Sequence, residues 1–326
     1  MFRTELLVSP SITHQISLSS SIFTIGSCFS EMLGEKLITH KWNVLNSPFG
    51  TLYNPLSIAE VCEACILKKD VNEDLFVHQN EVWYSYLYHS SIADLTKDGL
   101  SQKIQQLNTK TYNYLNTVNT VIVTLGSAWV HKLINHNRVV ANCHKSDNRL
   151  FEKRLLSVEE VVLALNHLTH LVRSINSSAQ FIFTLSPVRH VKETLPLNAV
   201  SKSILRLALH QFIESNTYSF YFPAYELVLD DLRDYRFYAE DMIHPNVVAE
   251  NYIWTKFIQT HFTESSTLFL KEWESILKSM AHKPFQTSTL VYQQFIQDMI
   301  TQLKQIEIKY SINIQAELDT LQNKLI

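Results

Sequence analysis

The chain has 326 residues, of which 46% are hydrophobic and 18% are charged, and its formal net charge is −3. This composition fits a folded protein with a full-sized core, and the charge gives no support for a nucleic-acid partner held by phosphate contacts. Only five residues are glycine, whereas an average usage of about 7% would give roughly 23. Dinucleotide-binding turns and P-loops need clustered glycines, so both motifs are excluded.

Strand-like and helix-like segments alternate between residues 20 and 260. Apolar runs and alternation predict strands at 21–25, 42–45, 81–88, 120–125, 180–185 and 218–222, with a hairpin at 132–141. Helical spacing predicts helices at 30–39, 55–68, 91–115, 157–175, 201–215 and 246–260. The third of these helices is expected to bend near Gly99, and Ser157 with Glu160 forms a capping-box pattern. This order predicts an α/β fold with a doubly wound, mainly parallel sheet.

The last part of the chain has a helical pattern only. Residues 287–326 contain no Pro or Gly, and their apolar residues recur every three or four positions. The spacing predicts one long amphipathic helix or a pair of helices. We therefore divide the chain into an α/β domain at 1–262 and a helical C-terminal extension at 263–326, through which a homodimer would form.

The four cysteines do not suggest a disulfide framework. Reduced thiols and a cytoplasmic location are expected. No apolar run is long enough to predict a membrane span, and the N-terminus is a poor signal peptide. Cys62 and Cys65, together with Cys143 and His144, could supply four zinc ligands, but core positions for Cys62 and Cys65 are favoured and no metal is expected.

Polar and small residues follow several of the predicted strands, at the sheet edge where α/β proteins bind ligands. The segments are 26–29, 49–51, 125–128, 186–190 and, later in the chain, 241–245. Three of the five glycines fall within them, at Gly26, Gly50 and Gly126. Glycine at a strand-to-helix turn lets a nucleophile and its oxyanion donors approach a substrate closely.

Asp241 and His244 have the spacing of an orienting carboxylate and a catalytic base. A carboxylate three residues before a histidine can hold one imidazole nitrogen while the other faces a nucleophile. Ser27 and Cys28, at the end of the first predicted strand, supply two candidate nucleophiles. The spacing alone is a weak signal, and the serine–cysteine pair strengthens it.

Seven motifs in order resemble the GSCFA-domain family, which is named for the first of them and belongs with the SGNH/GDSL hydrolase-like proteins. They are GSCFS (26–30), SPFGTLYNP (47–55), VTLGSAWV (123–130), VANCHK (140–145), LSPVRH (185–190), SKSIL (201–205) and YFPAYELVLDDLRDYRFYAEDMIHPN (221–246). The resemblance covers roughly residues 20–260. It implies a three-layer α/β/α fold of the SGNH or flavodoxin-like type.

The resemblance also implies roles for individual residues. The superfamily pattern Gly-Asp-Ser-Leu places Cys28 at the nucleophile position and Ser27 at the Asp position, which departs from the hydrolase pattern. This departure implies a thiol enzyme, or a site that no longer performs hydrolysis. A related group of bacterial polysaccharide-synthesis proteins also has Cys at this place and is linked to acyl transfer.

Three further blocks of the superfamily are matched to different degrees. The oxyanion-hole glycine corresponds to Gly50. The Gly-x-Asn block is replaced by Gly126 and Ser127 followed by alanine, so Ser127 or a backbone N–H would have to replace the Asn donor. The final Asp-x-x-His block is matched in full by Asp241 and His244.

Physical chemistry supports Cys28 as a nucleophile, because a helix N-terminus favours a thiolate. His244 would accept its proton and Asp241 would orient the ring. Ser27 as the nucleophile and a purely structural Cys28 remain open. Arg189 and His190 could bind a carboxylate or phosphate group, or Arg189 could form a salt bridge with Asp234 or another core carboxylate.

These observations lead to two functional hypotheses. The first is an SGNH-like esterase or acyltransferase that acts on acyl esters of carbohydrates or cell-envelope glycans through Cys28, His244 and Asp241. No cofactor is expected for it, with coenzyme A left open as an acyl donor. The second is a binding or scaffold protein that retains the fold and has lost hydrolysis.

Overall fold

The computed structural model describes residues 5–10, 14–282 and 284–325. Its central sheet has five parallel strands in the order β11-β10-β6-β1-β2. These strands are β1 (Ser21–Gly26), β2 (Asn43–Asn46), β6 (Thr120–Leu125), β10 (Gln180–Leu185) and β11 (Ser219–Phe222). Numbered in chain order, the five strands run 2-1-3-4-5 across the sheet, which is the flavodoxin-like order. The predicted doubly wound α/β fold is confirmed.

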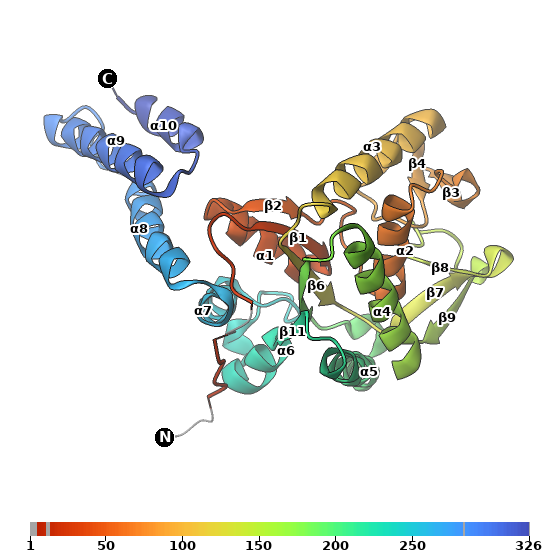
Figure 1. The fold of residues 1–326 in the computed structure, drawn as a ribbon. Coiled ribbons are helices and arrows are strands. Elements are labelled where there is room, and N and C mark those ends of the chain that lie inside the picture. Colours follow the sequence, from red (N-terminus) through yellow and green to blue (C-terminus); the bar gives the residue numbers. More distant parts are fainter. Residues whose placement is uncertain (1–4, 11–13, 283, 326) are drawn as a thin grey trace.

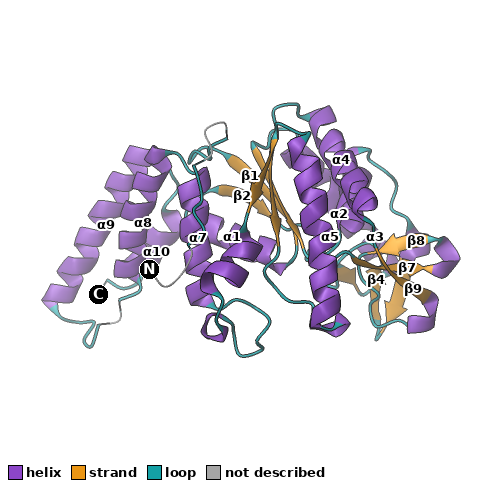
Figure 2. Ribbon diagram, turned by 90° about the horizontal axis from the view of Figure 1, so that it is seen from below, coloured by secondary structure: helices purple, strands orange, loops and turns teal. Residues whose placement is uncertain are grey.

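Helices cover both faces of the central sheet. They are α1 (Cys28–Thr39), α2 (Pro55–Ile66), α3 (Lys97–Leu115), α4 (Val158–Ile175), α5 (Leu195–Glu214), α6 (Ala224–Glu226) and α7 (Val247–His261). Figure 2 shows α1 and α7 on one side of the sheet and α2, α4 and α5 on the other. Two clusters of buried hydrophobic residues fill the two spaces between the layers. The architecture is therefore three-layered, α/β/α.

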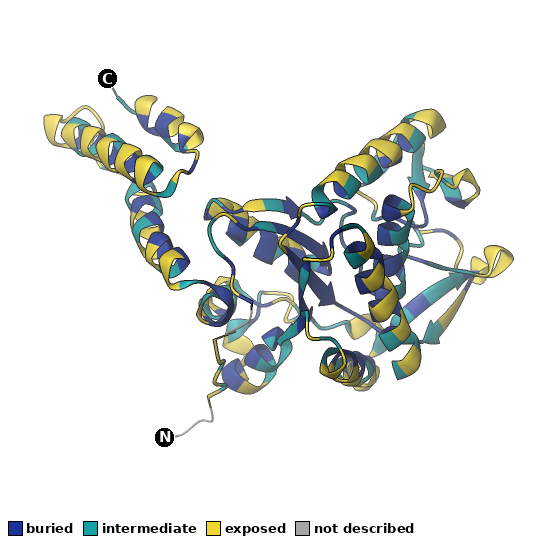
Figure 3. Cartoon of the chain, viewed as in Figure 1, coloured by how far each residue is buried: buried dark blue, intermediate teal, exposed yellow. Residues whose placement is uncertain are grey.

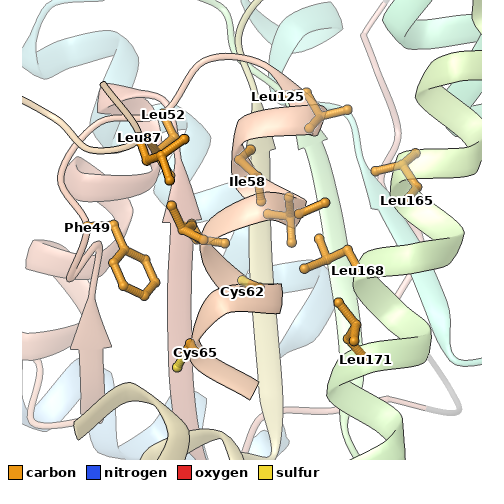
Figure 4. Close-up of a cluster of buried hydrophobic side chains, with 14 of the residues drawn as sticks. Phe49, Leu52, Ile58, Cys62, Cys65, Leu87, Leu125, Leu165, Leu168 and Leu171 are labelled. Carbon is orange, nitrogen blue, oxygen red and sulfur yellow. The ribbon is translucent and has the colours of Figure 1, made fainter. Parts of the chain in front are cut away.

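Helix α2 contributes two cysteines to one of these clusters. Figure 4 shows Cys62 and Cys65 among buried leucine, isoleucine and phenylalanine side chains. The thiol of Cys65 donates to the carbonyl of Asn108, and burial raises the pKa of both thiols. The described residues contain no cluster of three or more His, Cys, Asp or Glu side chains suited to a metal. Cys62 and Cys65 therefore belong to the core.

Two small antiparallel sheets flank the domain and were only partly predicted. They consist of β3 (Phe76–Gln79), β4 (Val82–Ser85) and β5 (Ala93–Asp94), and of β7 (Trp129–Leu133), β8 (Arg138–Val140) and β9 (Phe151–Leu155). The strand predicted at 81–88 is shorter and forms a hairpin with β3, because Asn80 and Glu81 both adopt positive φ as in a type I′ turn. The hairpin predicted at 132–141 is β7–β8, and β9 was not predicted.

Two helices begin at residues other than those predicted. Helix α3 begins at Lys97 rather than 91, because the Thr96 side chain accepts from the N–H of Gly99 and caps the helix. Gly99 therefore lies in the first turn, and the predicted bend there is wrong. Helix α5 begins at Leu195 with Pro196 in its first turn, where proline is favoured. The capping box of Ser157 and Glu160 is present at the start of α4.

The C-terminal extension consists of α8 (Glu264–Met280), α9 (Leu290–Tyr310) and α10 (Gln315–Gln322). The predicted helical stretch at 287–326 is thus a pair of helices, separated where Ser311 has a positive φ. The extension projects from the sheet domain, with exposed residues on its outer faces (Figures 1 and 3). Trp273 donates to the carbonyl of Thr39 at 2.9 Å, and Lys41 pairs with Glu317 at 2.6 Å. In the described part of the chain, no helix has the length and apolar character needed to cross a membrane.

Candidate active site

Cys28 follows a tight passage from β1 into α1. Gly26 has φ of +136°, and a Cβ there would lie 2.1 Å from the carbonyl oxygen of Thr124 on β6. Only glycine therefore allows β1 to approach β6 so closely. The N–H of Ser27 donates to the same carbonyl at 3.0 Å. Ser27 is the N-cap of α1, and Cys28 is its first residue. β1 and β6 are also the strands at which the strand order reverses, where α/β proteins bind ligands.

The two candidate nucleophiles differ in accessibility. Ser27 is 1% exposed and its buried hydroxyl has no hydrogen-bond partner, whereas Cys28 is a partly exposed free thiol. Burial raises the pKa of the Cys28 thiol, and this effect exceeds the lowering by the N–H groups of Phe29 and Cys28 and by the charge of Lys202. The start of the helix thus favours a thiolate as expected, but desolvation of the thiol outweighs this effect.

Asp241 and His244 form the predicted carboxylate–imidazole contact. The Asp241 Oδ2 atom lies 2.6 Å from the His244 Nδ1 atom. Asp241 Oδ1 accepts from the N–H groups of Ile243 and His244 at 2.9 and 3.0 Å. Hydrogen bonds from the backbone and ring of His244 and the N–H of Ile243 lower the pKa of Asp241 to about 2. The carboxylate thus fixes the ring through Nδ1 and leaves Nε2 for proton transfer.

The segment with Asp241 and His244 is tied to the loop that follows β10. The N–H of Arg189 donates to the carbonyl of Ile243 at 3.5 Å. The Arg189 guanidinium lies over the rings of Tyr238 and Tyr235, with 4.3 and 5.2 Å to the ring centroids. Asp234 is instead 3.7 Å from Arg236. The alternative of an Arg189–Asp234 salt bridge is therefore wrong.

His190 lies beside the end of β6. Its Nε2 atom is buried and has no hydrogen-bond partner, and it would lie 3.3 Å from a Cβ placed on Gly126. Its ring meets that of Tyr53 edge-on at 5.0 Å. Burial, with smaller effects from Lys202 and His244, lowers the pKa of His190 to about 4. His190 is therefore neutral at neutral pH and shares one site with Lys202 and His244.

The predicted oxyanion donors are engaged elsewhere. The N–H of Gly50 donates to the carbonyl of Ser47 at 2.8 Å, and those of Gly126 and Ser127 donate to the carbonyl of Tyr53 at 2.8 and 2.9 Å. The Ser127 hydroxyl accepts from the N–H of Trp129 at 3.0 Å. In this arrangement these groups hold the loops together, and their role toward an oxyanion stays a prediction. Gly50 has φ of +70°, and a Cβ there would meet the Cβ of His89 at 2.5 Å.

Lys202 is a site residue that the sequence reasoning missed. It lies on α5, is 2% exposed, and its Nζ atom donates to the carbonyls of Gly126 at 2.8 Å and Ser186 at 2.7 Å. These carbonyls mark the ends of β6 and β10. Burial lowers the pKa of Lys202 to about 7, and the charge of Cys28 acts in the opposite direction. The available signal was the SKSIL motif, in which a lysine occupies the apolar face of a helix.

A hollow of about 510 Å³ lies along α5 and reaches Lys202. Its lining consists of Lys202, Ser203, Arg206, Leu207, His210 and Tyr225. Another hollow, of about 620 Å³, lies between α8 and α9 and contains none of the predicted site residues. None of the predicted site residues lines the hollow along α5 either, and Lys202 is its link to the site.

The comparisons with known proteins address family membership. A family model described as "GSCFA family" matches residues 21–257. The chain belongs to this family. A second model, "GSCFA domain protein, C-terminal domain", matches residues 273–326. The GSCFA match contains all nine predicted site residues and Lys202.

No curated protein sequence matches the chain. Among solved structures, the chain is similar to a Clostridium thermocellum family 3 carbohydrate esterase, with 7% identity and a TM-score of 0.36. That match covers 78% of this chain and 98% of the esterase.

Proposed function

We propose that this GSCFA-family protein is an SGNH-like esterase or acyltransferase that uses Cys28 as its nucleophile. The observation that carries the proposal is the 2.6 Å contact between Asp241 and His244. Their loop is bonded to Arg189, after β10, and Cys28 follows β1 at the same edge of the parallel sheet. An oriented imidazole and an accessible thiol at one sheet edge are the parts that nucleophilic acyl chemistry requires.

The proposed reaction has two steps. The Cys28 sulfur attacks the acyl carbonyl, a carbon–sulfur bond forms, and the carbon–oxygen bond to the alcohol breaks. Water or the hydroxyl of an acceptor then attacks the thioester and restores the thiol. His244 exchanges protons with the oxygens that enter and leave, and Asp241 holds its ring.

His190 and the start of α1 are our candidates for the oxyanion site. The N–H groups of Cys28 and Phe29 are in the first turn of α1, which has no preceding carbonyls to accept from them within the helix. The unpartnered Nε2 of the neutral His190 ring can supply a further donor. This assignment places His190 in the role that the missing Asn has in the superfamily pattern.

The substrate class of the proposal is an acyl ester of a carbohydrate or a cell-envelope glycan precursor, with coenzyme A as a candidate donor for transfer. An open site is compatible with this class, because the Asp241 and His244 side chains are 45% and 49% exposed. Bulky acyl acceptors can reach Nε2 of His244 from solvent.

Acyl-enzyme trapping with 4-nitrophenyl acetate tests the proposal. We expect a burst of nitrophenolate and an acetyl group on Cys28, located by mass spectrometry of peptides. Cys28→Ala should abolish both signals, and the matched control Cys143→Ala, which alters a partly buried thiol elsewhere, should retain them. His244→Asn should slow turnover of the acyl-enzyme.

Two outcomes would contradict the proposal. Acetylation of Ser27 would move the nucleophile by one residue. If no acyl-enzyme forms and Cys28 reacts no faster than Cys143, the binding or scaffold alternative is favoured.

A further inference from the structure

Lys202 presents a buried amine that no carboxylate neutralises among the described residues. The titratable groups that face it come from three elements: Cys28 from α1, His190 from the loop after β10, and Tyr225 from α6, whose ring centroid is 5.8 Å from Nζ. A buried ammonium without an anionic partner is unfavourable. The surroundings therefore favour a neutral amine until an anion forms nearby.

The hydrogen bonds of Lys202 also fit a neutral amine. Its Nζ donates to the carbonyls of Gly126 and Ser186 at 2.8 and 2.7 Å. An ammonium has three N–H donors, whereas a neutral amine has two donors and one lone pair. The two carbonyls therefore satisfy both N–H groups of the neutral form and leave the lone pair to accept a proton.

The topology places the Lys202 amine and Cys28 at the ends of neighbouring strands. β1 and β6 are adjacent, with Gly26 paired to Thr124, and the N–H of Ser27 donates to the carbonyl of Thr124. Cys28 is one residue beyond Ser27, and Gly126, which holds Nζ, is two residues beyond Thr124. The charge of each group affects the pKa of the other, in agreement with this proximity.

We propose that Lys202 accepts the proton of the Cys28 thiol, so that a buried cysteine–lysine pair generates the nucleophile. The sulfur–hydrogen bond breaks, its electron pair remains on sulfur, and the proton forms the third N–H bond of Lys202. The pair changes from thiol and amine to thiolate and ammonium without a change in its total charge. This inference rests on the proposed function only in taking Cys28 as the nucleophile.

Alkylation of Cys28 by iodoacetamide tests the proton transfer without any acyl substrate. In that reaction the thiolate forms a carbon–sulfur bond and iodide leaves, so the rate reports the thiolate. The rate is measured from pH 5.5 to 10 and assigned to Cys28 by mass spectrometry of peptides. We expect the wild-type rate to show a step near pH 7, where Lys202 becomes able to accept a proton, and a further rise at higher pH, because burial raises the pKa of the Cys28 thiol.

Three variants sharpen the test. Lys202→Met should remove the step near pH 7. The alkylation rate should then reach half its maximum only at pH 9 or above, and the rate at pH 7.5 should fall at least tenfold. Lys202→Arg keeps a cation that cannot accept a proton, so the step near pH 7 should disappear. Lys256→Met is the matched control. Lys256 lies on the far helix α7, and its largely buried amine pairs with Glu5. This variant should retain the wild-type profile.

Several results would overturn the inference. A folded Lys202→Met protein with the wild-type profile excludes Lys202, and a Lys202→Arg protein with that profile assigns it a fixed-charge role only. If Lys202→Met fails to fold, the wild-type profile decides alone, because a single midpoint above pH 9 contradicts proton transfer to Lys202. Failure of the proposed function would give a different combination of results. In that case the alkylation rate of Cys28 depends on Lys202, but no acyl-enzyme forms from 4-nitrophenyl acetate.

Discussion

His261, the last residue of α7, is buried in a way that makes the protein sensitive to acid. Its ring is 1% exposed, neither ring nitrogen has a hydrogen-bond partner, and the rings of Phe257 and Phe222 lie at 5.0 and 5.9 Å. Burial, with a smaller effect from the charge of His14, lowers the pKa of His261 to about 3. Protonation of this ring is therefore much easier in the unfolded chain than in the folded protein.

The size of the effect follows from linkage. A histidine has a pKa of about 6.5 when unfolded, so its contribution to stability is complete at neutral pH and is lost as the pH falls from about 6.5 toward the folded value of about 3. At about 1.4 kcal/mol per pH unit, His261 alone lowers the free energy of unfolding by about 2 kcal/mol between pH 7 and pH 5. His14, whose pKa is lowered to about 4 by burial, acts in the same direction.

The substitution His261→Phe removes this titration and places an apolar ring beside two phenylalanines. We expect the loss of unfolding free energy between pH 7 and pH 5 to be smaller than in the wild type by about 2 kcal/mol. Urea unfolding at both pH values, followed by tryptophan fluorescence, measures this difference. His170→Asn, at an exposed position on α4, should keep the wild-type difference. If His261→Phe loses as much stability as the wild type, the reasoning from burial is refuted.

Three further predictions concern the fold and the site. Gly26→Ala should lower the free energy of unfolding by more than about 2 kcal/mol, because its Cβ would lie 2.1 Å from the Thr124 carbonyl oxygen. Thermal unfolding measures this loss, and it should be much smaller for Gly126→Ala, whose Cβ would lie 3.0 Å from its nearest atom. Trp273→Ala should cost about 3–5 kcal/mol, because the side chain is fully buried and donates to the Thr39 carbonyl, and limited proteolysis should then cleave the extension first. Asp241→Asn should lower kcat for an aryl ester by about 10²–10⁴-fold, because the ring of His244 loses its orienting carboxylate; an unchanged kcat would contradict the proposed role.

The sequence predicted the central sheet better than the small sheets, for a physical reason. β6 is buried along its whole length and β10 is buried except at its first residue, so each reads as a continuous apolar run. β9 has only one buried residue of five, and its pairing with β7 depends on a partner far along the chain. The start of α3 was misplaced because the capping contact between Thr96 and Gly99 is a local detail that the apolar spacing does not show.

The candidate site was predicted where it depends on local spacing and missed where it depends on tertiary contacts. The contact between Asp241 and His244 lies within four residues of sequence, so the motif contained it. The carbonyl of Tyr53, which occupies the N–H groups of Gly126 and Ser127, comes from a distant loop. The burial of Lys202 likewise depends on the ends of two strands meeting over α5. The partners in such contacts cannot be read from a single sequence, although the lysine on the apolar face of α5 was a signal that Lys202 is buried.

In the proposed site the Cys28 thiol is less exposed than the ring of His244, and this difference has a chemical consequence. Burial near Cys28 opposes both a thiolate and an ammonium. The proposed proton transfer would form the two together, so that each charge compensates the other. His244 lies about half exposed and can exchange protons with solvent. Under the proposed function, the choice between water and an acceptor hydroxyl is then made on the open side, beside His244. Changes around Arg189, whose guanidinium packs on Tyr238 beside that loop, should alter the ratio of transfer to hydrolysis without altering the reactivity of Cys28.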